Sequence, residues 1–149
     1  MSGVAFVVQL ASCLFMAGVI WIVQVVHYPL FARVGEAGYA GYQGAHMRLI
    51  TWVVLPAMAV ELASAAYLAW ASYGAPGGRF AQVWLPNLAL LGLIWLSTAA
   101  IQVPQHGALL EQFDASTHAA LVRGNWIRTI LWSARAVALA WLAVELYTE

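Results

Sequence analysis

Polar side chains that could do chemistry stand at the ends of apolar stretches in this sequence. In "QVVHYPLF", Gln24 and His27 are three residues apart, so they share one face of a helix. Gln102 and His106 stand on either side of the proline in "QVPQH". Neutral imidazole acts as a general base or a metal ligand, and an amide orients an oxygen-bearing group. These residues predict a polar site rather than a plain membrane exit.

Two charged residues stand deeper, inside sequence that is otherwise apolar. Glu61 and Arg135 each lie well within a long apolar segment. In a membrane such a charge costs at least ~2.5–3.5 kcal/mol, so it should face the interior and find a partner. We expect the two residues to pair, or to reach one shared polar cavity and form its floor. The simpler alternative is an ion pair that only fixes helix register.

The composition indicates that membrane helices position these residues. Of 149 residues, 64% are hydrophobic and 8% are charged, whereas a soluble domain averages about a quarter charged residues. Such a chain could not cover a water-exposed surface. The net charge is zero and the chain has no lysine, which argues against a nucleic-acid partner. The single cysteine, Cys13, lies within an apolar stretch and is expected to be a buried thiol.

Four segments are apolar enough to cross a bilayer, whose core of about 30 Å needs roughly 20 helical residues. Helices are required because lipid cannot satisfy backbone polar groups. The sequence therefore predicts an all-α integral membrane protein, a four-helix transmembrane bundle in a single domain over residues 1–149. The predicted spans are 4–26, 49–72, 83–103 and 126–147.

Proline, glycine and asparagine mark the predicted ends of these spans. Pro29 and Pro104 are expected to end the first and third spans, because proline lacks a backbone donor and disfavours helix before it. The stretch "YGAPGG" at 73–78 predicts a turn, and Asn125 is expected to cap the fourth span.

Two long connections, 28–48 and 104–125, are predicted on the same membrane face. Within the second, "DASTHAALVRG" predicts a short helix that starts near Asp114 or Ser116 and stops at Gly124. The positive-inside rule places both connections on the cytoplasmic side of a membrane of the bacterial inner-membrane type, with both termini outside. It rests on four arginines in or beside these connections, Arg33, Arg48, Arg123 and Arg128, against Arg79 on the other face.

The first and third spans show a faint internal repeat. "IWIVQVVHYP" (20–29) resembles "IWLSTAAIQVPQH" (94–106), since each has Ile-Trp followed by Gln, Pro and His. Two like-oriented hairpins around a pseudo-two-fold axis along the membrane normal would produce such a repeat. Chance similarity between apolar sequences is the alternative.

The predicted site combines polar groups that the four spans bring to the long-connection face. We expect His27 and His106 to act as base or ligand. The same end offers His46, which with these two histidines is a candidate metal ligand, whereas His118 is expected to be solvated. Two histidines on opposing helices could also hold haem, although no helix carries the spacing typical of a di-metal bundle. The residues expected to bind the substrate are Gln24, His46, Gln102, Asn125, Arg128, Glu61 and Arg135.

The second half of the chain resembles a known family at "VPQHGALLEQFD…LVRGNWIRTILWSAR". It is similar to DUF1772, a family of small four-helix membrane proteins that includes the anthrone oxygenases. That family has Val-Pro-x-Asn-x-x-Leu at the exit of the third span, a short helix, and a Trp followed at a distance by His and Arg. In place of the family's Asn this chain has His106 or Gln105, and the family's His is absent, with Trp132 nearby. The residues that match by type and order are Val103, Pro104, Leu109, Trp126 and Arg135.

The polar end and the resemblance together predict a small membrane-embedded enzyme. We expect it to be redox or oxygenase-like and to act on a lipophilic small molecule in a polar pocket at the long-connection face. The sequence assigns no cofactor. The alternatives are a haem- or metal-binding membrane protein, a small-molecule transporter or binding protein that would have to be a homodimer, and a structural subunit of a larger complex.

Overall fold

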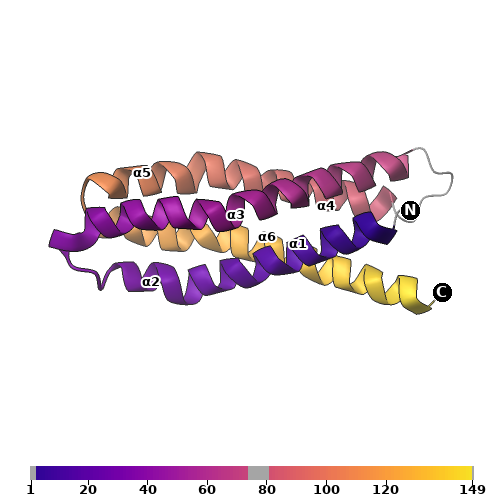
Figure 1. Ribbon diagram of the computed structural model, residues 1–149, viewed down its shortest axis with the longest axis horizontal. Helices are drawn as coiled ribbons and strands as arrows, with labels where there is room; N and C mark the ends of the chain where they lie inside the picture. The colour runs from indigo at the N-terminus through magenta and orange to yellow at the C-terminus, as the bar shows by residue number, and fades with distance from the viewer. Residues whose placement is uncertain (1–2, 74–80, 149) are drawn as a thin grey trace.

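Four long helical stretches, each antiparallel to the next one along the chain, make up the computed structural model, which describes residues 3–73 and 81–148 (Figure 1). The first comprises α1 (Gly3–Ile22), the π-helical turn η1 (Val23–His27) and α2 (Tyr28–Phe31). The second is α3 (Glu36–Tyr73). The third comprises α4 (Ala81–Ser97), the π-helical turn η2 (Thr98–Gln102) and α5 (Val103–Glu111), and the fourth is α6 (Ala115–Thr148). The predicted turn at 73–78 lies, beyond Tyr73, outside the described residues.

The four stretches form the predicted bundle. Helices α1 and α4 each pack against both α3 and α6. Each stretch is long and apolar enough to cross a membrane, so the prediction of an all-α membrane bundle is confirmed. Large apolar side chains such as Trp52, Leu93 and Val137 are exposed on the outside, where lipid would cover them. The core between the helices includes Cys13, which is fully buried as expected.

The two long connections predicted from the sequence are largely helical. Helix α3 begins at Glu36 and runs for 38 residues, about 57 Å, so it extends well beyond the apolar segment 49–72. Tyr39, Gln43 and His46 recur at helical spacing and are buried, and this packing keeps the polar segment helical. Within these two connections, the non-helical links are residues 32–35 and 112–114, and both lie at the same end of the bundle, as predicted (Figure 1).

Neither proline ends its span, which corrects the sequence prediction. The Tyr28 N–H donates to the carbonyl of Val23, five residues back, and the Val103 N–H donates to Thr98 in the same way. Each π turn widens the helix just before a proline. The proline then lies in the first turn of the following α-helix. A backbone N–H is not needed for an intrahelical bond at that position, so proline is tolerated there. The two segments of the internal repeat therefore share this local backbone.

Helix α6 begins as expected but does not stop where the sequence suggested. Asp114 caps it, because its Oδ2 accepts hydrogen bonds from Ser116 Oγ (2.7 Å) and the Thr117 N–H (2.6 Å). These bonds lower the pKa of the Asp114 carboxyl to about 2. The helix then continues through Gly124, so Asn125 is a buried mid-helix residue and not a cap.

Close helix packing explains the glycine at position 124. A Cβ atom there would lie 3.2 Å from Ile101 Cγ2 and 3.6 Å from Gln102 Nε2, both on η2. Gly124 is therefore present for the close approach of α6 to η2 and not as a helix terminator.

We predict that Gly124→Leu destabilises the bundle, because the larger side chain forces α6 and η2 apart. Overpacking of this kind costs about 1–3 kcal/mol, and thermal unfolding in detergent measures the loss. Gly92→Leu is the matched control, since Gly92 lies on α4 with no atom near the place of a Cβ. Equal melting temperatures for the two variants would contradict this account of Gly124.

Candidate functional site

A cavity of about 150 Å³ lies between the four helical stretches, toward the end that carries the two short links. Its walls are mostly apolar, with side chains such as Met16, Ile20, Met58 and Trp132. The polar groups along it include Tyr28, His46, Thr98, Gln102, His106 and Arg128. The structure thus brings residues from four separate parts of the sequence to one hollow.

The Tyr28 hydroxyl is the meeting point of these polar groups. Its Oη lies 2.8 Å from His106 Nε2 and 3.2 Å from Arg128 Nη2. Tyr28 is buried, and its carbonyl lies 2.8 Å from His118 Nε2. His118 is therefore a buried residue of the site, not a solvated one. It satisfies one of the carbonyls that a helix end leaves without a partner in the helix.

Gln43 fixes the proton arrangement of His106. Gln43 Nε2 lies 2.7 Å from His106 Nδ1 and 3.3 Å from the His106 carbonyl oxygen. A carbonyl oxygen only accepts, so the shared Gln43 atom is the amide nitrogen, and Nδ1 accepts its second proton. The neutral ring then carries its hydrogen on Nε2 and donates it to Tyr28 Oη. Tyr28 consequently accepts two hydrogen bonds, and its own O–H proton remains available to a group in the cavity.

Asn125 and Gln24 hold Arg128 in place. Asn125 Oδ1 accepts hydrogen bonds from Arg128 Nε (2.9 Å) and Nη2. Asn125 Nδ2 in turn donates to Gln24 Oε1 (2.8 Å), and Gln24 Nε2 donates to the carbonyl of Val122 (3.1 Å). Three predicted substrate-binding residues thus form one chain of hydrogen bonds, in which Gln24 and Asn125 position Arg128.

His27 reaches the cavity only through His46. His27 Nε2 lies 2.9 Å from His46 Nδ1, and His46 lines the cavity, whereas His27 is not among the described lining residues. On the opposite wall Gln102 is almost fully buried, and its Oε1 accepts a hydrogen bond from Ser97 Oγ (3.1 Å). Gln102 Nε2 has no hydrogen-bond partner among the described residues.

The three candidate metal ligands do not assemble into a metal site. Over residues 3–73 and 81–148, no three His, Cys, Asp or Glu side chains are placed to hold one ion. The ring nitrogens of His106 face Gln43 and Tyr28, and His27 is bonded to His46. Hydrogen bonding within the protein therefore accounts for these donors, and the geometry gives them no common ligand position.

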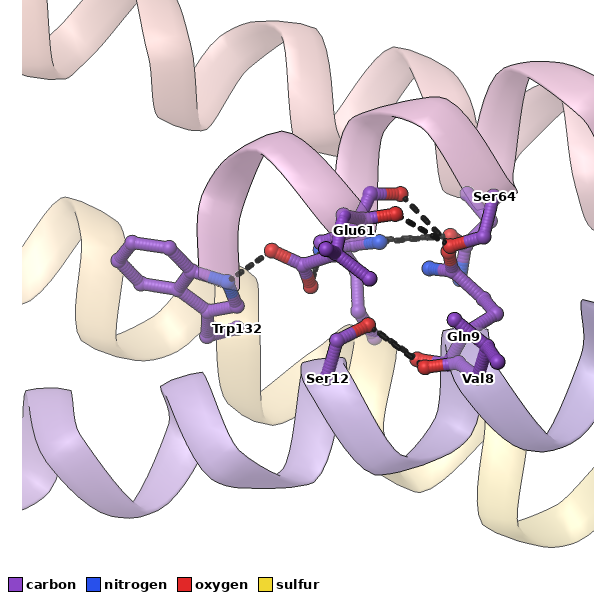
Figure 2. A network of polar contacts seen from close by, with 9 residues as sticks. Val8, Gln9, Ser12, Glu61, Ser64 and Trp132 are labelled. Atoms are coloured by element: carbon purple, nitrogen blue, oxygen red, sulfur yellow. Dashed lines mark hydrogen bonds and ion pairs between the residues drawn. The ribbon is translucent and has the colours of Figure 1, made fainter. Parts of the chain in front are cut away.

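Glu61 and Arg135 form the predicted ion pair. Arg135 Nη1 contacts Glu61 Oε1, and both side chains are 0% exposed. Asn87 Oδ1 accepts two further bonds from Arg135, from Nε (3.2 Å) and Nη2 (3.0 Å). The pair does not form the cavity floor, which corrects that expectation. Trp132 takes this position, since it lines the cavity and donates its Nε1–H to Glu61 Oε2 (3.1 Å; Figure 2).

The same deep network continues toward α1. Ser64 Oγ lies 2.6 Å from Gln9 Oε1, and Gln9 is fully buried (Figure 2). The network joins α1, α3, α4 and α6 below the cavity. We interpret it as a structural layer that fixes the register of the four helices.

Sequence reasoning missed two residues of the site, Tyr28 and Gln43. The sequence presents Tyr28 as an ordinary interfacial aromatic and places Gln43 in an apparent connection. Gln43 lies three residues before His46, and this helical spacing was the one signal that could have identified it.

No family model matches this chain, and no curated protein or solved structure matches it either. The resemblance to DUF1772 stays a prediction, and the function has to be argued from the site itself.

We predict that Glu61→Gln lowers the stability of the bundle by about 3–5 kcal/mol, because it leaves the buried Arg135 guanidinium without a carboxylate. The double variant Glu61→Gln/Arg135→Gln should recover much of this loss in thermal unfolding. Glu36→Gln, at an exposed position, is the control. Losses that simply add in the double variant would show that the pair is not coupled.

Proposed function

We propose that this protein is a membrane-embedded enzyme that acts on a lipophilic small molecule carrying an oxygen function. The observation that supports this most strongly is the Tyr28 hydroxyl, which accepts bonds from His106 and Arg128 and keeps its own proton for a bound group. The apolar walls suit a lipophilic body, and a few convergent polar groups in such a cavity are typical of a small-molecule site.

Proton transfer to and from a ring ketone is the chemistry that these residues would support. Tyr28 would donate to the carbonyl oxygen, with Arg128 stabilising the negative charge that develops there. His46 would remove the proton from the neighbouring carbon, in the tautomer whose Nδ1–H donates to His27 Nε2 and leaves His46 Nε2 free. His27 is then a positioning residue for the base, and His106 has the same role for Tyr28.

A redox step would follow from this chemistry. Proton removal next to a carbonyl gives an electron-rich enolate, and the resemblance implies an oxygenase-like reaction with dioxygen as the oxidant. The enolate carbon would form a bond to one oxygen atom of dioxygen, which takes up two electrons from the carbon and one proton to give a hydroperoxide. The roles proposed for Tyr28, His46 and Arg128 concern the proton transfer alone, so they can be tested without an oxidant.

We predict that the purified protein accelerates exchange of the α-hydrogens of cyclohexanone with deuterated water, measured by mass spectrometry. Tyr28→Phe and His46→Gln should each lower the rate by about 10²–10⁴-fold, since each removes an acid or base group. Tyr73→Phe is the matched control, because Tyr73 is exposed at the far end of α3. Exchange no faster than in protein-free detergent would overturn the proposed reaction.

We also propose a bacterial inner membrane location, with the links 32–35 and 112–114 in the cytoplasm. Arg33, Arg48 and Arg123 are exposed near that end and support this orientation, whereas Arg128 is buried and carries no topological information.

We predict that Ala32→Cys reacts with a membrane-impermeant maleimide only after spheroplasts are lysed. Thr148→Cys, at the other end of the bundle, should react in intact spheroplasts. The native Cys13 is fully buried and serves as the unreactive background. The opposite labelling pattern would reverse the proposed topology.

A further inference from the structure

The two buried arginines of α6 differ in charge compensation. Arg135 is paired with Glu61. Arg128 is 8% exposed, and its hydrogen-bond partners in the described part of the chain are Asn125, Tyr28 and Thr98, all of them neutral. A buried cation without a counter-ion is costly in an apolar environment. The cavity beside Arg128 is therefore the place where a negative charge would be most stabilised.

The cavity also has more donors than acceptors. The Tyr28 O–H and Gln102 Nε2 each have a hydrogen that no described protein group accepts. Arg128 Nη1 makes only a long contact, 3.5 Å, with Thr98 Oγ1. Tyr28, Gln102 and Arg128 all belong to the lining of the same cavity. A ligand that satisfies them must present acceptor oxygen atoms.

The size of the cavity limits the body that carries those oxygens. Its volume is about 150 Å³, and an apolar cavity of that volume holds a molecule such as benzene. Met16, Met58 and Trp132 supply apolar walls around this space. The volume fits one six-membered ring.

We propose that the ligand of this cavity is an anion on a single ring, a carboxylate or a phenolate, whose charged oxygen contacts Arg128 and Tyr28. This inference rests on the proposed use of the cavity as a small-molecule site. It adds the size of the molecule and the charge of the form that the site stabilises, since a ring ketone that has lost its α-proton is an enolate and carries its negative charge on the same oxygen as a phenolate does. Gln102 then donates to the same oxygen or to its neighbour in a carboxylate. Within the protein, Glu61 supplies the negative charge that balances Arg135. For Arg128, the bound anion would supply that charge.

The test is calorimetric titration of the full-length protein in detergent with pairs of probes that differ in charge. Benzoate is compared with benzamide, and 4-nitrophenol in mildly alkaline buffer is compared with its neutral methyl ether, 4-nitroanisole. We expect one or both anions to bind at least about tenfold more tightly than the neutral partner, which is the loss expected for a missing charged hydrogen bond. A preference for benzoate over benzamide would identify the ligand as a carboxylate, and a preference for 4-nitrophenolate over 4-nitroanisole would identify it as a phenolate.

Three variants connect the binding to the residues. Arg128→Gln should remove the preference for the anion, and Gln102→Met should weaken anion binding while leaving the arginine in place. Arg123→Gln, an exposed arginine on the same helix, should bind as the wild type does. Thermal unfolding of each variant shows that it is folded, and Gln102→Met gives a result even where Arg128→Gln fails to fold.

Several results would overturn the inference. These are equal binding of the charged and neutral probes, no binding of any probe, anion preference retained in Arg128→Gln, or displacement of benzoate by chloride at similar concentrations. Failure of the proposed reaction is recognised separately. A protein that binds the anion through Arg128 but does not accelerate deuterium exchange retains the ligand class and loses the proposed enzymatic step.

Discussion

The widening of two helices by one residue, each time just before a proline, is the constraint on which the site depends. In a regular α-helix the ring of Pro29 would clash with the carbonyl four residues back, and the helix would kink or end there. The π turn lets Tyr28 bond to Val23 instead, so the helix continues to Phe31. One extra residue also rotates all later side chains by about 100°. Tyr28 and, after the second turn, His106 face each other across the bundle because both helices contain this insertion.

A second constraint comes from α6, which presents a polar stripe to the interior. Asn125, Arg128, Trp132 and Arg135 follow one another at helical spacing and are all buried. Trp132 divides the stripe, because its ring lines the cavity while its Nε1–H bonds to Glu61 on the other side. Trp132 therefore lies between two arginines that are only about two helical turns apart: Arg135, which is paired with Glu61, and Arg128, whose partners are neutral. One layer can then fix the helix register while the other borders the cavity.

Composition and hydropathy were enough to predict the number, type and order of the membrane helices, because lipid permits few alternatives. They were also enough to predict the Glu61–Arg135 pair, since a deep charge must find a partner. The helix ends were wrong at Pro29, Pro104 and Gly124. Local rules for proline and glycine do not register a π turn or the close approach of Ile101 to α6.

The candidate site was predicted less completely than the fold, for a related reason. Side chains such as Gln24, Asn125 and Arg128 attract notice because they are polar in apolar sequence, and the structure joins them. Tyr28 is unremarkable in sequence, and its importance comes from two donors on other helices. These two donors, His106 and Arg128, are 78 and 100 residues away from Tyr28 in the sequence. Helix packing brings them together, so residue spacing within one helix could not predict the contact.

The position of His46 links the cavity to the surroundings of the bundle. A second cavity, of about 320 Å³, lies between the end of the first stretch and α3, and its lining includes His27, Leu49 and Val53. His46 and Ile50 line both cavities, and His46 is hydrogen-bonded to His27, which lines the second one. Leu49 and Val53 are exposed on the outer face of α3, which lipid would cover. The residue proposed as the base therefore lies beside both the inner cavity and this lipid-facing one, where a lipophilic molecule from the bilayer would arrive.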